Sequence, residues 1–277
     1  MDSFRNGPLV FPVLDEGSGP PVVLLHGFPQ DASSWDAVVP FLHEQGLRTL
    51  RPEQRGYAAT ARPQSTSDYR VTHLVSDVLA LLDAAGLERA HVVGHDWGGA
   101  VAWAMACSKP DRVETLTVLS TPHPAAFLRS FLTSTQGLHS AYMIPFQPPG
   151  LAEWWLGGPG NEGRVRALLQ PFGAPPAAVE TAVRLMADRD RLRAMLQWYR
   201  ALPRSVDSTA RAHCSVPTTY AWSTKDAALG RAAAEQTARY VDGPYRFEVL
   251  EGLSHWLPEQ APATVAGLIT DRVVDRR

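Results

Sequence analysis

The chain has few cysteines, few charges and no long apolar run. Its two cysteines, Cys107 and Cys214, are too few for a disulfide framework. Charged residues make up 19% and the net charge is −2, which indicates no basic surface for nucleic acid. No apolar stretch approaches the length of a membrane span, and residues 1–8 lack the apolar region of a secretion signal. We therefore expect a soluble, cytoplasmic protein with no nucleic-acid and no membrane partner.

Apolar residues make up 45% of the 277 residues, which is enough for a large core. Short apolar runs alternate with amphipathic stretches at both ends of the chain, a pattern typical of a mostly parallel sheet flanked by helices. This α/β pattern predicts strands at residues 9–14, 22–25, 47–50, 91–93, 113–119, 216–222 and 245–250. It predicts helices at residues 35–45, 72–85, 100–108, 229–240 and from 262 onward.

Residues 92–99, Val-Val-Gly-His-Asp-Trp-Gly-Gly, are the most informative segment. Gly94-x-Asp96-x-Gly98 is the frame of a nucleophile elbow, in which a strand turns sharply into a helix. The two glycines allow the backbone to come close to itself, and the middle side chain is held at the end of the sheet. Here the middle residue is Asp96, where the common pattern has serine.

An aspartate at this position changes the chemistry that the elbow can perform. A carboxylate, with a reference pKa near ~3.9, is ionised at neutral pH and attacks without the help of a base. At a saturated carbon it forms an ester that water can reopen, whereas serine would form a stable ether. The elbow therefore predicts displacement at saturated carbon by Asp96. The competing interpretation is a helix N-cap, a position that aspartate favours.

The alternation of strands and helices stops between Thr121 and His213. This segment is rich in proline, glycine and aromatic residues and then becomes helical over residues 177–200. It follows the strand after the elbow helix, and ligands gather at the carboxyl ends of such strands. We therefore predict a core domain from residues 1–120 and 214–277 and a lid domain from residues 121–213.

Two further residues complete a catalytic set in the order nucleophile, acid, histidine. Asp226 and His255 each lie in a loop after a predicted strand. A loop aspartate is often a simple turn residue, and one histidine among nine is a weak signal, but their joint placement favours catalysis. We predict that His255 activates the water that hydrolyses the ester and that Asp226 orients its imidazole.

An oxyanion on the Asp96 carbonyl needs hydrogen-bond donors. The backbone N–H of Trp97, at the start of the helix, is one candidate. The backbone N–H of Phe28, in the turn His26-Gly27-Phe28-Pro29, is the second. The competing interpretation of that turn is a Gly-Pro boundary between a strand and a helix.

The motifs together resemble the soluble epoxide hydrolases of the α/β-hydrolase fold. The matching segments span nearly the whole chain: residues 26–29 with Trp35, residues 54–57, 94–99 and 198–200, Asp226, and residues 252–256. The resemblance implies a cofactor-independent and metal-free enzyme that adds water to an epoxide and releases a vicinal diol. Its partners would be a small hydrophobic epoxide and water, and the resemblance leaves a homodimer open.

In that family two lid tyrosines donate hydrogen bonds to the epoxide oxygen. The segments at residues 142–147 and 198–200 resemble the two that carry them, which implies Tyr142 and Tyr199. Ring opening produces an alkoxide, which a phenol can stabilise or protonate. The competing interpretations are a cavity wall for Tyr142 and, for Tyr199, the apolar stripe of a packed helix at residues 192, 195, 196 and 199.

An aspartate elbow also occurs in haloalkane dehalogenases, so it does not by itself specify epoxides. Phe28 stands where those enzymes often carry a halide-holding asparagine, which argues against dehalogenation. The indole N–H of Trp97 can serve a halide, so haloalkane or haloacid dehalogenation stays an alternative. A non-catalytic scaffold that only binds a ligand is another.

The substrate site is expected to be apolar and aromatic. We predict Phe28, Trp97 and Phe146 as substrate-binding residues, and the expected lining also includes Trp35, Trp154 and Trp155. The family pattern differs at two supporting positions, where this chain has Glu53 and Ala58. The size and stereochemistry of the epoxide depend on the shape of the lid, which is the least patterned part of the sequence.

Overall fold

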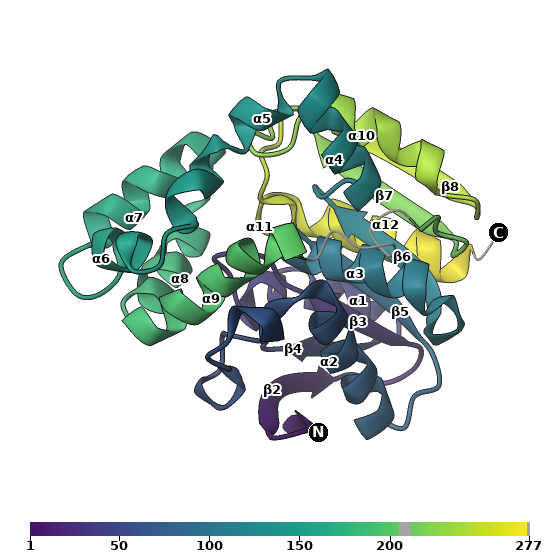
Figure 1. Cartoon of the computed structure of the whole chain (residues 1–277). Helices are drawn as coiled ribbons and strands as arrows, with labels where there is room; N and C mark the ends of the chain where they lie inside the picture. Colours follow the sequence, from purple (N-terminus) through teal and green to yellow (C-terminus); the bar gives the residue numbers. More distant parts are fainter. Residues whose placement is uncertain (205–211, 276–277) are drawn as a thin grey trace.

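The computed structural model describes residues 1–204 and 212–275. Within these residues one eight-stranded sheet forms the centre of the molecule, in the order β1-β2-β4-β3-β5-β6-β7-β8 (Figure 1). The strands from β3 to β8 pair in parallel, and β1 and β2 are antiparallel at one edge. The predicted α/β fold with a mostly parallel sheet is confirmed. The strands are β1 (Ser3–Asn6), β2 (Leu9–Glu16), β3 (Pro21–Leu25), β4 (Arg48–Pro52), β5 (Ala90–His95), β6 (Val113–Leu119), β7 (Thr218–Ser223) and β8 (Tyr245–Leu250).

All seven predicted strands are present with shifts of a few residues, but β1 was not predicted. Its sequence Ser-Phe-Arg-Asn has no apolar run, and Phe4 is its one buried side chain. Phe4 stacks on Phe11 of β2 with ring centroids 4.9 Å apart. The strand therefore forms because its neighbour provides an apolar partner, which a local pattern does not reveal.

Helices cover both faces of the sheet (Figure 1). Buried side chains of α2 (Val71–Ala84) and α3 (Trp97–Ser108) pack with one core cluster. Those of α1 (Val39–Glu44) and α12 (Pro262–Val274) pack with a second cluster on the opposite face. Strand β3 supplies Val23 and Leu25 to the first cluster and Val22 and Leu24 to the second, as the alternation of a strand requires.

Two predicted helices of the core are shorter than expected. The predicted helix at residues 35–45 is a 3₁₀ turn, η1 (Ala32–Trp35), followed by α1. The predicted helix at residues 229–240 is α10 (Arg231–Gln236) followed by η9 (Thr237–Tyr240). The remaining short core elements are η2 (Ala59–Ala61), η3 (Thr66–Tyr69), η4 (Pro110–Arg112) and α11 (Leu257–Gln260).

The chain between β6 and β7 is helical wherever regular structure is described. Its elements are α4 (Pro124–Thr133), α5 (Gln136–His139), η5 (Ala141–Phe146), α6 (Leu151–Leu156), α7 (Glu162–Leu169), η6 (Gln170–Phe172), α8 (Pro176–Met186), α9 (Arg189–Ala201) and η7 (Leu202–Arg204). Helices α6 to α9 lie to the left of the sheet in Figure 1, and α4 and α5 lie above it. The predicted lid, residues 121–213, includes residues 205–211, which lie outside the described residues. None of the described helices is both long and apolar enough to cross a membrane.

Candidate active site

The turn from β5 into α3 has the geometry of a nucleophile elbow. Asp96 has φ 52°, in the left-handed region that non-glycine residues rarely adopt. A methyl group on Gly94 would overlap the Gly98 carbonyl, and one on Gly98 would overlap the Leu25 carbonyl of the adjacent strand. The glycines are therefore required by close approach of the backbone, as the motif predicts. Asp96 occupies the N-cap position of α3 but its side chain makes no capping hydrogen bond.

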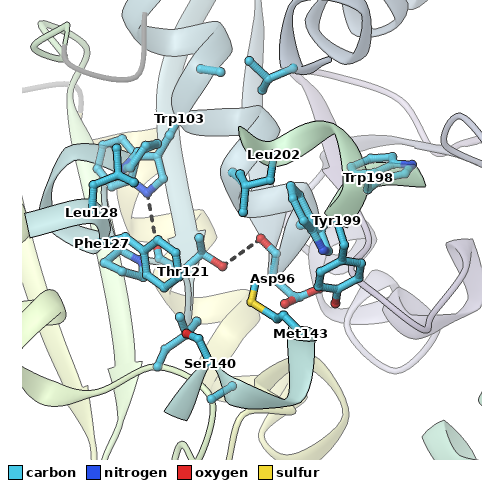
Figure 2. Close-up of a pocket in the computed structure, with 18 of the residues that line it drawn as sticks. Asp96, Trp103, Thr121, Phe127, Leu128, Ser140, Met143, Trp198, Tyr199 and Leu202 are labelled. Atoms are coloured by element: carbon cyan, nitrogen blue, oxygen red, sulfur yellow. Dashed lines mark hydrogen bonds between the residues drawn. The ribbon is translucent and has the colours of Figure 1, made fainter. Parts of the chain in front are cut away.

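The Asp96 carboxylate instead faces the loops after β3 and β8. The Phe28 N–H donates to Oδ1 at 2.7 Å, and Oδ2 lies 3.4 Å from Nε2 of His255. The Thr121 hydroxyl donates to the Asp96 backbone carbonyl at 2.7 Å (Figure 2). These contacts hold both the carboxylate and the backbone of Asp96, and the side chain lies at the edge of a cavity.

The Asp226 carboxylate holds the imidazole of His255. Its Nδ1 lies 2.8 Å from Oδ2 of Asp226, and both side chains are buried. The second oxygen, Oδ1, accepts the backbone N–H groups of Ala228 and Leu229 at 2.8 and 2.9 Å. Since both Asp226 oxygens are engaged, the carboxylate has one orientation, and the imidazole presents Nε2 to Asp96.

The electrostatics of the site favour an ion pair between Asp96 and His255. Burial acts to lower the pKa of His255, but Asp226 and Asp96 outweigh it and raise this pKa to about 10. Burial acts to raise the pKa of Asp96, but the hydrogen bond and charge of His255 outweigh it and hold this pKa below its usual value. At neutral pH Asp96 is therefore a carboxylate beside an imidazolium.

Tyr142 of η5 and Tyr199 of α9 both line the space beside Asp96. The Tyr199 ring is in edge-to-face contact with the Trp97 ring, with ring centroids 5.1 Å apart. Burial raises the pKa of both phenols, so both hydroxyls stay protonated at neutral pH. The predicted packed stripe of α9 is also present, since its side chains at positions 192, 195, 196 and 199 are buried. Tyr199 thus belongs both to the packed stripe and to the cavity wall.

Two cavities meet at Asp96, Tyr142 and Tyr199. The larger has a volume of about 140 Å³, and its walls include Trp97, Trp103, Phe127, Leu128, Met143 and Leu202 (Figure 2). The smaller has a volume of about 30 Å³, and its walls include Phe28, Phe146, Leu169, Phe172, His255 and Trp256. A molecule with its reactive centre at Asp96 would therefore extend apolar groups in two directions.

The predicted aromatic lining is partly wrong. Phe28, Trp97 and Phe146 line these cavities as expected. Trp35 instead packs with α1 and α12 in the cluster on the opposite face of the sheet. Trp154 is 67% exposed on α6, and neither it nor Trp155 lines the two cavities. A count of aromatic residues does not distinguish cavity, core and surface.

A buried network behind the elbow was not predicted. His95 Nε2 lies 2.8 Å from the His255 carbonyl, so this nitrogen carries the hydrogen. The Gly27 N–H donates to Gln30 Oε1, and Gln30 Nε2 donates to Glu259. Burial lowers the pKa of His95 to about 4 and raises that of Glu259 to about 7. The network ties the loop of Phe28 to the loop of His255, and the position of His95 inside the elbow motif was the available signal.

A buried ion pair in the helical segment was also not predicted. Arg200 of α9 forms a bidentate pair with Glu153 of α6 at 2.8 and 3.0 Å, and both side chains are buried. Arg200 also donates to the Phe146 carbonyl of η5 at 2.9 Å. It therefore joins the helix that carries Tyr199 to the turn that carries Tyr142. The signal was a glutamate in a stretch of sequence that otherwise has almost no charge.

Comparison with known proteins agrees with this geometry. A model of the alpha/beta hydrolase fold family matches residues 20–262. The chain therefore belongs to the alpha/beta hydrolase fold family, and its relatives place it with the epoxide hydrolases, as the motifs predict.

The relatives are similar over nearly their full length. The chain is 31% identical to Epoxide hydrolase A of Mycobacterium tuberculosis over 92% of this chain and 91% of that protein. It is 33% identical to the AB hydrolase superfamily protein YfhM of Bacillus subtilis over 91% of this chain and 90% of that protein. The crystal structure of Epoxide Hydrolase A from Mycobacterium thermoresistibile superposes with a TM-score of 0.81 at 25% identity, over 99% of this chain and 98% of the other.

Proposed function

We propose that the protein adds water to a hydrophobic epoxide and releases a vicinal diol through a covalent ester on Asp96. One observation carries the proposal: two protonated phenols, Tyr142 and Tyr199, stand with the elbow carboxylate at the meeting point of two apolar cavities. The resemblance to Epoxide hydrolase A supports the same reaction. The chain is accordingly a hydrolase acting on ether bonds.

In the first step Asp96 attacks one epoxide carbon. A bond forms between a carboxylate oxygen and that carbon, and the carbon–oxygen bond of the ring breaks. The departing oxygen becomes an alkoxide, which the hydroxyls of Tyr142 and Tyr199 stabilise and protonate. The imidazolium of His255 releases one proton as Asp96 loses its charge, and this proton restores the phenol that protonated the alkoxide. The epoxide and the ion pair thus become a neutral hydroxy ester and a neutral imidazole.

In the second step a water molecule attacks the carbonyl carbon of the ester. Neutral His255 takes a proton from the water, and Asp226 stabilises the imidazolium that forms. The tetrahedral oxyanion is held by the Phe28 N–H, which contacts Oδ1 in the free protein. The Trp97 N–H is among the first amides of α3, which have no acceptor within the helix, and is the second proposed donor. Collapse breaks the acyl carbon–oxygen bond, and the diol leaves with the proton from His255. The Asp96 carboxylic acid then gives its proton to His255, which restores the ion pair.

The helical segment acts as the lid of this site. Its elements supply both tyrosines and walls of both cavities, whereas the core supplies Asp96, Asp226 and His255. We propose residues 1–120 and 214–277 as the catalytic core and residues 121–213 as the lid. In this division the core performs ester chemistry and the lid activates the epoxide oxygen.

Trapping of the ester tests the proposed mechanism. His255→Gln should still be alkylated but should hydrolyse its ester slowly, because it lacks a base. After incubation with styrene oxide, the intact mass of His255→Gln should increase by the mass of one epoxide, and that of Asp96→Ala should not. Peptide mapping that places the adduct on any residue other than Asp96 would disprove the mechanism.

A matched substrate pair tests the reaction class. Phe28 offers no side-chain amide to a halide, and the Trp97 ring packs edge-to-face on the Tyr199 ring, with centroids 5.1 Å apart. We therefore expect diol from aromatic or long-chain epoxides and little halide from haloalkanes of the same length. Halide release above diol formation would assign the aspartate to dehalogenation. Tight binding of both compounds without any product would favour a ligand-binding scaffold.

A further inference from the structure

The outer surface of the first lid elements has almost no charge. Between residues 129 and 160 the only Asp, Glu, Lys or Arg residues are Arg129 and Glu153, although such residues make up 19% of the chain. Glu153 is buried in its pair with Arg200, which leaves Arg129 as the one exposed member of this set. An exposed stretch of this length normally carries charges of both signs.

Large apolar side chains occupy this surface instead. Leu132 is 90% exposed, Leu138 78% and Ile144 69%, and Phe131 is also exposed. They come from α4, α5 and η5, which contact one another in succession. An added methyl on Gly137 of α5 would lie 3.7 Å from the Phe131 ring, so the first two elements meet at these residues. We call the four side chains the apolar outer surface.

The apolar outer surface lies next to the larger cavity. The same elements line that cavity with Phe127 and Leu128 of α4 and Met143 of η5. Phe127 is in edge-to-face contact with Phe131, with ring centroids 4.9 Å apart. Phe127, Leu128 and Met143 are half-buried, so these walls of the cavity are themselves partly exposed to solvent.

We propose that the apolar outer surface docks on an anionic lipid bilayer and that the larger cavity takes its hydrophobic substrate directly from the bilayer. Three observations favour a bilayer. Exposed leucine and phenylalanine side chains insert into the boundary between headgroups and acyl chains. The stretch has no exposed carboxylate that anionic lipid would repel, and Arg129 provides a cation beside Phe131 and Leu132. Elements α4 and η5 contribute both to the docked surface and to the cavity walls, so the cavity lies beside the phase in which a hydrophobic epoxide concentrates.

Vesicle sedimentation tests the docking surface without any catalytic step. Wild-type protein should pellet with vesicles of equal parts phosphatidylcholine and phosphatidylglycerol. Leu132→Glu combined with Leu138→Glu should weaken this binding about tenfold or more. Val274→Glu is the matched control, because Val274 is 78% exposed on α12, outside the lid, and it should bind as wild type. Arg129→Gln should weaken binding to these vesicles about fivefold and leave weak binding to pure phosphatidylcholine unchanged.

Kinetics separate this inference from the proposed function on which its substrate part rests. The double variant should hydrolyse a water-soluble epoxide at the wild-type rate and a long-chain epoxide dissolved in vesicles more slowly. Absence of diol from the soluble epoxide in both proteins contradicts the proposed function, whatever the vesicles show. Wild-type protein that stays in the supernatant, or a double variant that pellets equally, overturns the docking proposal. A wild-type dimer that the double variant converts to a monomer assigns the surface to a second copy of the chain.

Discussion

The loops at the strand ends and the helical segment position their functional side chains by different means. Asp96 is placed by its own backbone, at φ 52° between crowded glycines, and Asp226 by two backbone amides. Tyr199 is placed by side chains, in edge-to-face contact with Phe28, Trp97 and Phe146 at centroid distances of 5.1 to 5.2 Å. Groups fixed by the backbone tolerate changes in neighbouring side chains, whereas groups fixed by packing move with them.

The difference separates two kinds of mutational sensitivity. Substitutions in the loop frame should prevent the site from forming at all. Substitutions in the helical segment should change the rate of epoxide opening, or the stability of that segment, while the core stays folded. The following predictions test this contrast, from the largest expected effect to the smallest.

Gly98→Ala should have the largest effect, because its methyl group would overlap the Leu25 carbonyl. We expect a loss of more than about 4 kcal/mol in the free energy of unfolding, or no folded protein. Gly163→Ala in α7 is the control, since nothing lies within 4 Å of its added methyl group. Its free energy of unfolding should be unchanged or raised by up to about 1 kcal/mol. Urea unfolding measures both, and a Gly98→Ala protein as stable as wild type contradicts the crowded frame.

The tyrosines should show the next largest effect, on rate and not on folding. Tyr142→Phe combined with Tyr199→Phe should slow single-turnover alkylation by about 10³-fold or more, since no phenol remains to stabilise the alkoxide. Each single variant should slow alkylation much less, because the other hydroxyl still reaches the oxygen. On a logarithmic scale, its decrease in rate should be well under half of the decrease in the double variant. Thermal unfolding controls for stability. Alkylation at the wild-type rate in the double variant would leave both tyrosines as packing residues.

Breaking the buried ion pair should loosen the lid alone. Glu153→Gln leaves the Arg200 charge buried without its carboxylate, which typically costs about 3 kcal/mol or more. Glu180→Gln is the control in the same segment, because its pair with Arg166 is exposed and should contribute little to the free energy of unfolding. Hydrogen exchange should increase in α6, η5 and α9 of the first variant and stay low in β5 and β6. Faster exchange throughout the sheet would show that lid and core unfold together.

The smallest predicted change is in the pKa of His255 on substitution Asp96→Asn. The effect considered is on titration and stability, since the substitution also removes the proposed nucleophile. The substitution removes one of the two carboxylates that raise the pKa of His255 to about 10, so this pKa should fall. Because the pKa of His255 is raised in the folded protein, its charge stabilises the fold fully below the ordinary imidazole value of 6.5, and this contribution is lost as the pH rises through about 10. In the Asp96→Asn variant this stabilising contribution of His255 should disappear at a lower pH than in the wild type. Imidazole NMR titration and urea unfolding across this range measure both, and an unchanged pKa would contradict the ion pair.

The features that the sequence predicts well are those that depend on short local motifs. The glycine frame, the strand ends and the order of Asp96, Asp226 and His255 follow from local rules, and the structure brings these three side chains together. The strand β1 was not predicted, and Trp35 and Trp154 were wrongly expected in the cavity lining. These features depend on residues distant in the sequence. The side chains of Glu153 and Arg200 meet across 47 residues for the same reason.

The sequence predicts the lid tyrosines only in part. Their segments match a family pattern, but packing and catalysis use the same apolar spacing along α9. The sequence of the helix alone does not say which of its buried side chains faces the cavity. That depends on where Phe28 and Trp97 stand, and both belong to the core.

The crowding around position 96 has an evolutionary consequence. Gly94 and Gly98 carry the steric demands of the turn, and a methyl group on Gly27 would overlap the Asp96 side chain. The Asp96 side chain contributes no capping bond to the helix that follows. A single substitution at position 96 can therefore change the nucleophile while the backbone of the turn keeps its conformation. The reaction type then depends on the side chain at one position, whereas the shape of the turn depends on the glycines around it.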